Sequence, residues 1–153
     1  MGFALHSPAF AAGGAIPDRH LRTGRNLSPP LRWTDPPAGT RSFVLVVEDP
    51  NPPHGVVQLW AAHGINPDQT ALREGVGANE AGIRQAPNDL GKPRYDGPQP
   101  PVEHGVYHYH FLLAALDVPE LVVPGDATAG DVWEAAHPHL IERADLVGIV
   151  APG

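Results

Sequence analysis

The residues of this chain that are best suited to chemistry are a carboxylate in a proline-rich turn and two tyrosines in one expected strand. Asp49 lies in the segment Glu48-Asp49-Pro50-Asn51-Pro52-Pro53, and Tyr107 and Tyr109 lie two positions apart. A carboxyl group can transfer a proton as a general acid or base, and phenolic hydroxyls can donate hydrogen bonds to a developing oxyanion. Because side chains alternate along a strand, the two tyrosines are expected to share one face.

Short apolar runs rich in β-branched and aromatic residues predict the elements that position these groups. The expected strands are Phe43–Glu48, Val56–Ile65, Val106–Leu116, Leu121–Val123 and Leu146–Ala151. A helix is expected at Ala129–Arg143, with Thr128 as its N-cap and Asp131 near its positive N-terminal end. Pro138 is expected to kink or divide that helix. The sequence therefore predicts one domain, residues 1–153, that is mainly β with one C-terminal helix.

The composition argues against several classes of function. Ten basic residues against 17 acidic ones leave a net charge of -7, which disfavours nucleic acid and anionic membranes as partners. The absence of cysteine excludes disulfides, thiolate metal sites and a cysteine nucleophile. No nucleophile elbow, P-loop or dinucleotide-binding motif occurs, and neither a signal peptide nor a membrane-spanning run is expected. A cytoplasmic protein that needs no cofactor and does not insert into membranes is therefore the expectation.

Nine histidines raise the question of a metal site. His108 and His110 stand at alternate strand positions, where two side chains can share a metal ion. They are expected on the face opposite the two tyrosines, and no third ligand follows at a reliable spacing. We therefore expect adventitious binding at most, and no functional metal site.

Several strings follow one another along the chain in a characteristic order. They are Ile16-Pro17-Asp18-Arg19-His20, Gly24-Arg25-Asn26-Leu27-Ser28-Pro29-Pro30-Leu31-Arg32-Trp33, Glu48-Asp49-Pro50-Asn51-Pro52-Pro53, Asn88-Asp89-Leu90-Gly91, Tyr95-Asp96-Gly97-Pro98-Gln99-Pro100-Pro101 and Tyr109-His110-Phe111. In this order they resemble the phosphatidylethanolamine-binding proteins (PEBP), and the chain length resembles the bacterial branch called Raf-kinase-inhibitor-like. The resemblance implies a PEBP-like sandwich of antiparallel sheets, few helical turns besides the C-terminal helix, and a small ligand pocket at one end.

The resemblance also implies which residues form the pocket. They are Asp49 and Asn51 from the first loop, Tyr95, Gly97, Pro100 and Pro101 from the second, and Leu59, Tyr107 and Tyr109 from two strands. Leu59 and Tyr107 stand where the family has histidines, and Asn51 stands where it has a second aspartate. His63 is added as a candidate because it follows Leu59 by four positions, which predicts the same strand face; whether it reaches the pocket rim or is only half-buried stays open.

Two functions follow from these substitutions, and both stay open. The first is a small-molecule-binding protein whose pocket is altered from the family's anion site toward an apolar or aromatic ligand, because Asp49 repels phosphate and two imidazoles are lost. The alternative is a cofactor-independent enzyme of small-molecule biosynthesis, such as a cyclase, isomerase or hydrolase. Asp49 would then be the general acid or base, with Tyr107 and Tyr109 as hydrogen-bond donors. A scaffold or kinase-regulatory role ranks third, and the bacterial relatives leave a homodimer open.

Overall fold

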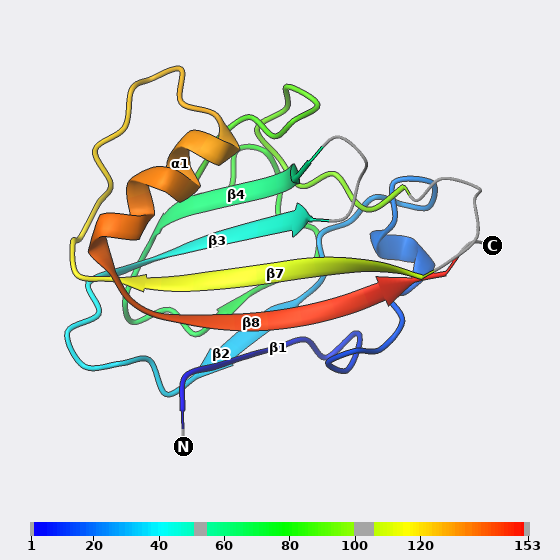
Figure 1. The fold of residues 1–153 in the computed structure, drawn as a ribbon, viewed down its shortest axis with the longest axis horizontal. Coiled ribbons are helices and arrows are strands. Elements are labelled where there is room, and N and C mark those ends of the chain that lie inside the picture. Colours follow the sequence, from blue (N-terminus) through cyan, green and yellow to red (C-terminus); the bar gives the residue numbers. More distant parts are fainter. Residues whose placement is uncertain (1, 51–54, 100–105, 152–153) are drawn as a thin grey trace.

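The structure, a computed structural model, describes residues 2–50, 55–99 and 106–151 and contains two antiparallel sheets (Figure 1). The larger sheet has the order β6-β4-β3-β7-β8. Its strands are β3 (Ser42–Asp49), β4 (Val57–Ile65), β6 (Arg84–Gln85), β7 (Tyr107–Leu116) and β8 (Leu140–Val150). The smaller sheet has the order β1-β2-β5 and consists of β1 (Ala4–His6), β2 (Leu31–Thr34) and β5 (Ala71–Leu72).

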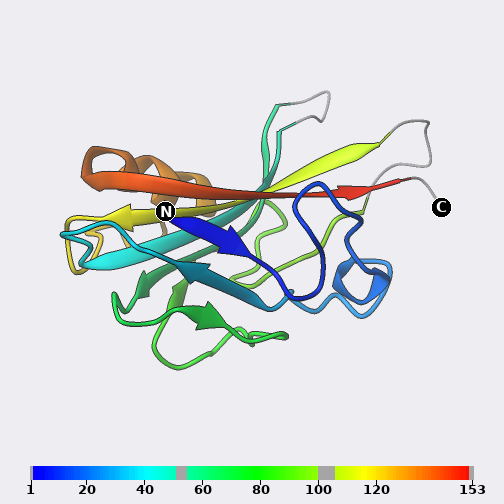
Figure 2. The ribbon, with the colours of Figure 1, turned by 90° about the horizontal axis from the view of Figure 1, so that it is seen from below.

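Strand β3 is covered on both faces, which explains its continuous apolar run from Phe43 to Val47. Phe43, Leu45 and Val47 pack into the main core, together with Trp33 of β2 and other residues of the N-terminal segment. Val44 and Val46 pack instead into a second cluster, against helix α1 (Ala129–Ala136). Figure 2 shows the helix on one side of the large sheet and β1 and β2 on the other. The prediction of a mainly β domain with a C-terminal α-helix is confirmed.

Helix α1 begins as predicted and ends earlier than predicted. The Thr128 hydroxyl accepts a hydrogen bond from the Asp131 backbone N–H, and the Asp131 carboxylate accepts one from the Thr128 N–H, which forms a capping box. Pro138 lies in a short 3-10 helix, η2 (His137–His139), directly after α1. The predicted helical stretch over residues 140–143 was wrong, because this segment pairs with β7 as the first part of β8. Pairing in the sheet overrides the local helical spacing of the apolar residues.

The shortest elements were not predicted. Strands β1, β2, β5 and β6 span two to four residues each, and the 3-10 helix η1 (Asp18–His20) lies in a turn-rich segment. The expected strand Leu121–Val123 is absent from this described segment, where Leu121 is buried and Val122 is 97% exposed without any strand partner. Such short segments gain their strand geometry from neighbours in space, so their own residues carry little signal.

Candidate functional site

The expected site residues on β3 and β7 meet at one end of the large sheet. Asp49 is the last residue of β3, and the preceding residue, Glu48, pairs with His110 of β7. The β3 end therefore lies beside Tyr109, which belongs to the main core together with the half-buried Tyr107. In Figure 1 this end is where β3 finishes and β7 begins, on the right. The predicted shared face of the two tyrosines is confirmed.

Tyr109 is the best-defined hydrogen-bond donor of this site. Its side chain is buried, with 2% of the residue exposed. Burial raises the pKa of its hydroxyl strongly, the nearby Asp49 carboxylate and Tyr107 raise it further, and the positive charge of Arg22 opposes them. The phenol is therefore protonated at neutral pH and donates a hydrogen bond. The same interactions place Asp49, Tyr107 and Arg22 within electrostatic range of one hydroxyl group.

Arg22 was not predicted as a site residue. Its Nε donates to the Gly97 carbonyl at 3.2 Å, its Nη1 donates to Gln99 Oε1 at 3.2 Å, and its backbone N–H donates to the Pro98 carbonyl at 3.0 Å. These contacts hold a guanidinium close to Tyr109, whose pKa the positive charge lowers. A cation thus stands near the site although the family's imidazoles are missing. In the sequence Arg22 is only a basic residue between two of the strings that resemble the family. Its position there does not predict that its side chain lies near Tyr109.

Tyr95 and Gly97, both predicted from the second loop, pack against the backbone after η1. The Tyr95 hydroxyl donates to the His20 carbonyl at 2.8 Å, and its ring packs edge-on against Trp60 with centroids 5.6 Å apart. A Cβ atom on Gly97 would lie 2.0 Å from the His20 carbonyl oxygen, so no larger residue fits there. Burial raises the pKa of Tyr95, which keeps this hydroxyl protonated as a donor. Both residues therefore fix the second loop against the backbone after η1, and their role in a pocket stays a prediction.

A buried carboxylate, Asp96, connects three segments of the chain by hydrogen bonds. Its oxygens accept hydrogen bonds from the side-chain amides of Asn26 and Asn88, both at 2.8 Å, and Arg94 lies 3.2 Å away. The Asn88 amide also donates to the Leu59 carbonyl at 3.2 Å. Burial alone would raise the pKa of Asp96, but the hydrogen bonds from Asn88, Asn26 and Arg94 outweigh it and the pKa is lowered. Asp96 stays ionised, and it was not predicted as a framing residue.

Leu59 and His63 lie on opposite faces of β4, so the predicted shared face was wrong. Leu59 and Trp60 both pack into the main core, whereas His63 faces helix α1 beside Val132. The cause is a register shift between Val47 and Glu48 of β3, which pair with Trp60 and Gln58 and leave Leu59 as the extra residue of β4. Such a bulge breaks the alternation of side chains along a strand.

His63 is also remote from Asp49 along the sheet. Asp49 pairs with Val57 at one end of β4, whereas His63 lies near the other end and pairs with Arg84 of β6. His63 therefore does not line the Asp49 end of the sheet. Asn51, Pro100 and Pro101, the other predicted pocket residues, lie outside the described residues.

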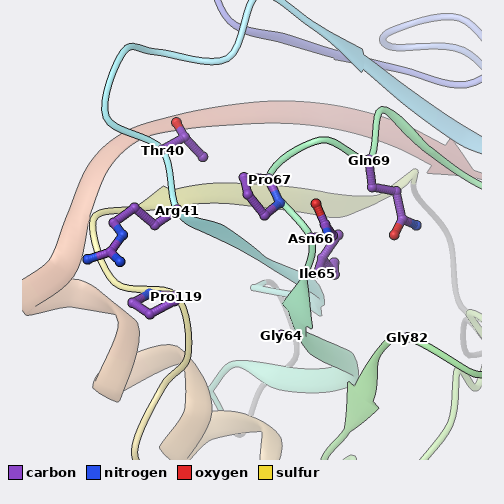
Figure 3. Close-up of a pocket in the computed structure, with 9 residues that line it drawn as sticks. All are labelled: Thr40, Arg41, Gly64, Ile65, Asn66, Pro67, Gln69, Gly82 and Pro119. Atoms are coloured by element: carbon purple, nitrogen blue, oxygen red, sulfur yellow. The ribbon is translucent and has the colours of Figure 1, made fainter.

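A separate hollow lies away from these residues. It measures about 830 Å³ and lies at the opposite end of the sheet, where β3 begins and β4 ends (Figure 3). Its polar side chains do not converge, because Arg41 and Gln69 point to different sides of the hollow (Figure 3). Within the same described ranges, no three His, Asp or Glu side chains are grouped so that they could hold a metal ion.

The two antiparallel sheets, packed with a common core between them, define a β-sandwich. The model of the phosphatidylethanolamine-binding protein family matches residues 6–151. The UPF0098 protein of Methanothermobacter thermautotrophicus is 40% identical over 152 residues, which cover 97% of this chain and 99% of that protein. This chain therefore belongs to the phosphatidylethanolamine-binding protein family, and the resemblance seen in the sequence is confirmed.

Two solved structures of the family share the fold. Escherichia coli YbcL, described as a member of the mammalian PEBP family, matches with a TM-score of 0.92 at 25% identity, over 99% of both chains. CT736 of Chlamydia trachomatis, described as a PEBP homologue, matches with a TM-score of 0.87 at 32% identity, also over 99% of both chains. The predicted PEBP-like sandwich is confirmed by these matches.

The compartment of the protein stays a prediction. None of the helices in the described residues has the length and apolar character that a membrane crossing requires. Among the relatives, LppC of Mycobacterium tuberculosis carries the name of a lipoprotein and is 37% identical over 144 residues, which cover 94% of this chain and 70% of that protein. The expected cytoplasmic location and the expected bacterial, Raf-kinase-inhibitor-like branch are therefore not decided by these relatives.

Proposed function

We propose that this PEBP-family protein binds a small organic molecule, with an apolar or aromatic body, at the Asp49 end of the large sheet. The observation that carries the proposal is the buried, protonated Tyr109 hydroxyl within electrostatic range of both Asp49 and Arg22. Asp49 can accept a hydrogen bond from the ligand, and Tyr109 can donate one to it. Such a pair recognises an uncharged polar group, for example an amide, at the edge of an apolar body.

The surroundings of these groups favour an apolar body over a phosphate. Leu59 and Tyr107 occupy the positions of the family's histidines, and both contact the main core. Arg22 is the cation that acts on Tyr109, and its guanidinium already donates to Gly97 and Gln99. A phosphate would meet the Asp49 charge and gain fewer charged donors than an imidazole pair supplies.

The test compares benzamide with inorganic phosphate as probes in isothermal titration and NMR. Benzamide should bind the full chain more tightly than phosphate. Asp49→Asn should weaken benzamide and strengthen phosphate, because the substitution removes the carboxylate charge. Tyr109→Phe should weaken benzamide up to about tenfold, since a hydrogen bond contributes ~0.5–1.5 kcal/mol. The matched control is Asp68→Asn, an exposed aspartate in the turn after β4. Tighter phosphate than benzamide binding by the unmodified chain would refute the proposal.

A second candidate is cofactor-independent catalysis at the same residues, and the protonated state of Tyr109 favours it. A phenol that stays protonated beside a carboxylate can stabilise a developing oxyanion while Asp49 transfers a proton. For the hydrolase class the probe is p-nitrophenyl acetate, measured by release of p-nitrophenolate. Asp49→Asn and Tyr109→Phe should each lower the rate at least about tenfold. If Asp49→Asn hydrolyses the ester as fast as the unmodified chain, this candidate fails.

A further inference from the structure

A second cavity lies between helix α1 and the large sheet, on the face opposite the main core. Its volume is about 200 Å³, and its lining includes His63, Arg84, Gln85, Val123, Ala127 and Val132. Polar and apolar atoms contribute about equally to its surface. The position and lining are independent of the Asp49 end of the sheet, since His63 points to the α1 side of β4.

Among the polar side chains that line this cavity, His63 has a ring nitrogen without a hydrogen-bond partner in the described residues. The residue is only 6% exposed, and its Nδ1 atom is buried without a hydrogen-bond partner in the described part of the chain. A buried polar atom that lacks a partner costs about 1–3 kcal/mol, so native structures seldom retain one without a reason. The His63 side chain lines the cavity, so a turn of the imidazole ring would bring this nitrogen to a hydrogen-bonding group of a bound molecule and remove the cost.

The other polar side chains of the cavity already have partners. Gln85 accepts a hydrogen bond from the Trp60 indole at 2.7 Å and donates one to the Gly77 carbonyl at 2.7 Å. Arg84 forms an ion pair of 2.5 Å with Glu120. Because the two charges of this pair balance, the cavity rim offers no net charge to a ligand.

The imidazole itself is uncharged at neutral pH. Burial lowers the pKa of His63, the positive charge of Arg84 lowers it further, and Glu120 opposes both. A neutral imidazole carries one N–H donor and one acceptor nitrogen, and a hydroxyl group can serve as partner to either. An uncharged ligand with a hydroxyl therefore fits both tautomers.

We propose that this cavity binds a small uncharged molecule with an apolar body about one ring in size and a single hydroxyl group that hydrogen-bonds to the imidazole of His63. The size limit follows from the volume, which is about 200 Å³ and falls below the ~300–1,000 Å³ of pockets for larger ligands. The apolar body packs against Val123, Ala127 and Val132. Its burial supplies the favourable free energy, and the hydroxyl supplies the specificity.

The test is an NMR titration of the full chain with phenol, compared with toluene and benzoate. Phenol should shift the signals of His63, Ala127 and Val132 and bind about 2- to 12-fold more tightly than toluene, the range that one hydrogen bond supplies. Benzoate, which is charged, should bind more weakly than phenol. His63→Leu should reduce phenol binding to the level of toluene, whereas the control Val122→Ala, at a 97% exposed position, should change neither.

Two outcomes would overturn the proposal. The first is that phenol leaves the His63, Ala127 and Val132 signals unchanged, which means that the cavity holds water only. The second is that phenol binds equally well to the unmodified chain and to His63→Leu. Because phenol can also enter the Asp49 site, the titration is repeated on Tyr109→Phe, in which the shifts at His63 must persist. The comparison of ligands on the unmodified chain keeps the test decisive even where a variant folds poorly.

Discussion

Replacing Gly97 by alanine should destabilise the protein and open the Asp49 site. The new Cβ would lie 2.0 Å from the His20 carbonyl oxygen and 3.0 Å from the Arg22 backbone nitrogen. Since Cβ atoms in proteins do not approach closer than 3.0 Å, the two segments must separate by at least about 1 Å. That movement would break the Tyr95–His20 hydrogen bond of 2.8 Å and the Arg22–Gly97 hydrogen bond of 3.2 Å.

The expected loss of stability combines two effects. Overpacking costs ~1–3 kcal/mol, and each of the two lost hydrogen bonds costs ~0.5–1.5 kcal/mol, which together lower the free energy of unfolding by about 2–6 kcal/mol. Arg22 should also move away from Tyr109, so benzamide binding should weaken. Urea denaturation followed by tryptophan fluorescence measures the first effect, and isothermal titration measures the second.

The matched control is Gly77→Ala, where an added Cβ meets nothing within 4 Å and the backbone φ is not positive. Its free energy of unfolding should stay within ~0.5 kcal/mol of the unmodified chain. If Gly97→Ala behaves like this control, with the same dependence on urea, then the close approach between Gly97 and His20 does not hold in solution. That result would refute the inference that Gly97 holds the second loop against the backbone at His20 and Arg22.

Three further predictions concern stability. Asp96→Asn should lower the free energy of unfolding at neutral pH by ~1.5–3 kcal/mol. Because the folded pKa of Asp96 lies below 3.8, the stabilisation by its carboxylate is complete above that value and is lost as the pH falls through the folded pKa. Urea titrations should therefore show that the difference from the unmodified chain shrinks in acid. The pKa values of His20 and His63 are lowered from 6.5 in the folded chain, so the unfolded chain binds more protons as the pH falls. The urea midpoint of the unmodified chain should therefore fall between pH 7.5 and pH 5.5. In His63→Gln this decrease in midpoint should be smaller. Thr128→Ala removes the hydroxyl of the α1 capping box and should cost ~0.5–2 kcal/mol in thermal or urea unfolding, whereas an unchanged midpoint would contradict the cap.

The long strands and the start of the helix were predictable because their signals are local. The run from Phe43 to Val47 is continuously apolar because β3 lies between two layers, and only its final residues, Glu48 and Asp49, approach the surface. Thr128 and Asp131 stand at the spacing of a capping box, which depends on four consecutive residues alone. Asp49 and Tyr109 were predicted as site residues because the order of several strings resembles the family.

The parts that escaped prediction depend on contacts between distant segments. Residues 140–143 have helical spacing but form the start of β8, because β7 offers them a ladder of hydrogen bonds. Arg22 reaches the site through Gly97 and Gln99, more than seventy positions further along the chain. A bulge in β4 sends His63 to the helix side, and nothing in its own sequence neighbourhood specified that extra residue.

The balance of charge at the two sites points to the same kind of ligand. At the Asp49 end, the guanidinium of Arg22 opposes the carboxylate in its effect on Tyr109. At the α1 cavity, Arg84 pairs with Glu120 and the imidazole of His63 is neutral. The whole chain carries a net charge of -7, which opposes the approach of anions to either place. Uncharged molecules escape this repulsion and lose less hydration on entry, so both sites should favour them over anions of equal size.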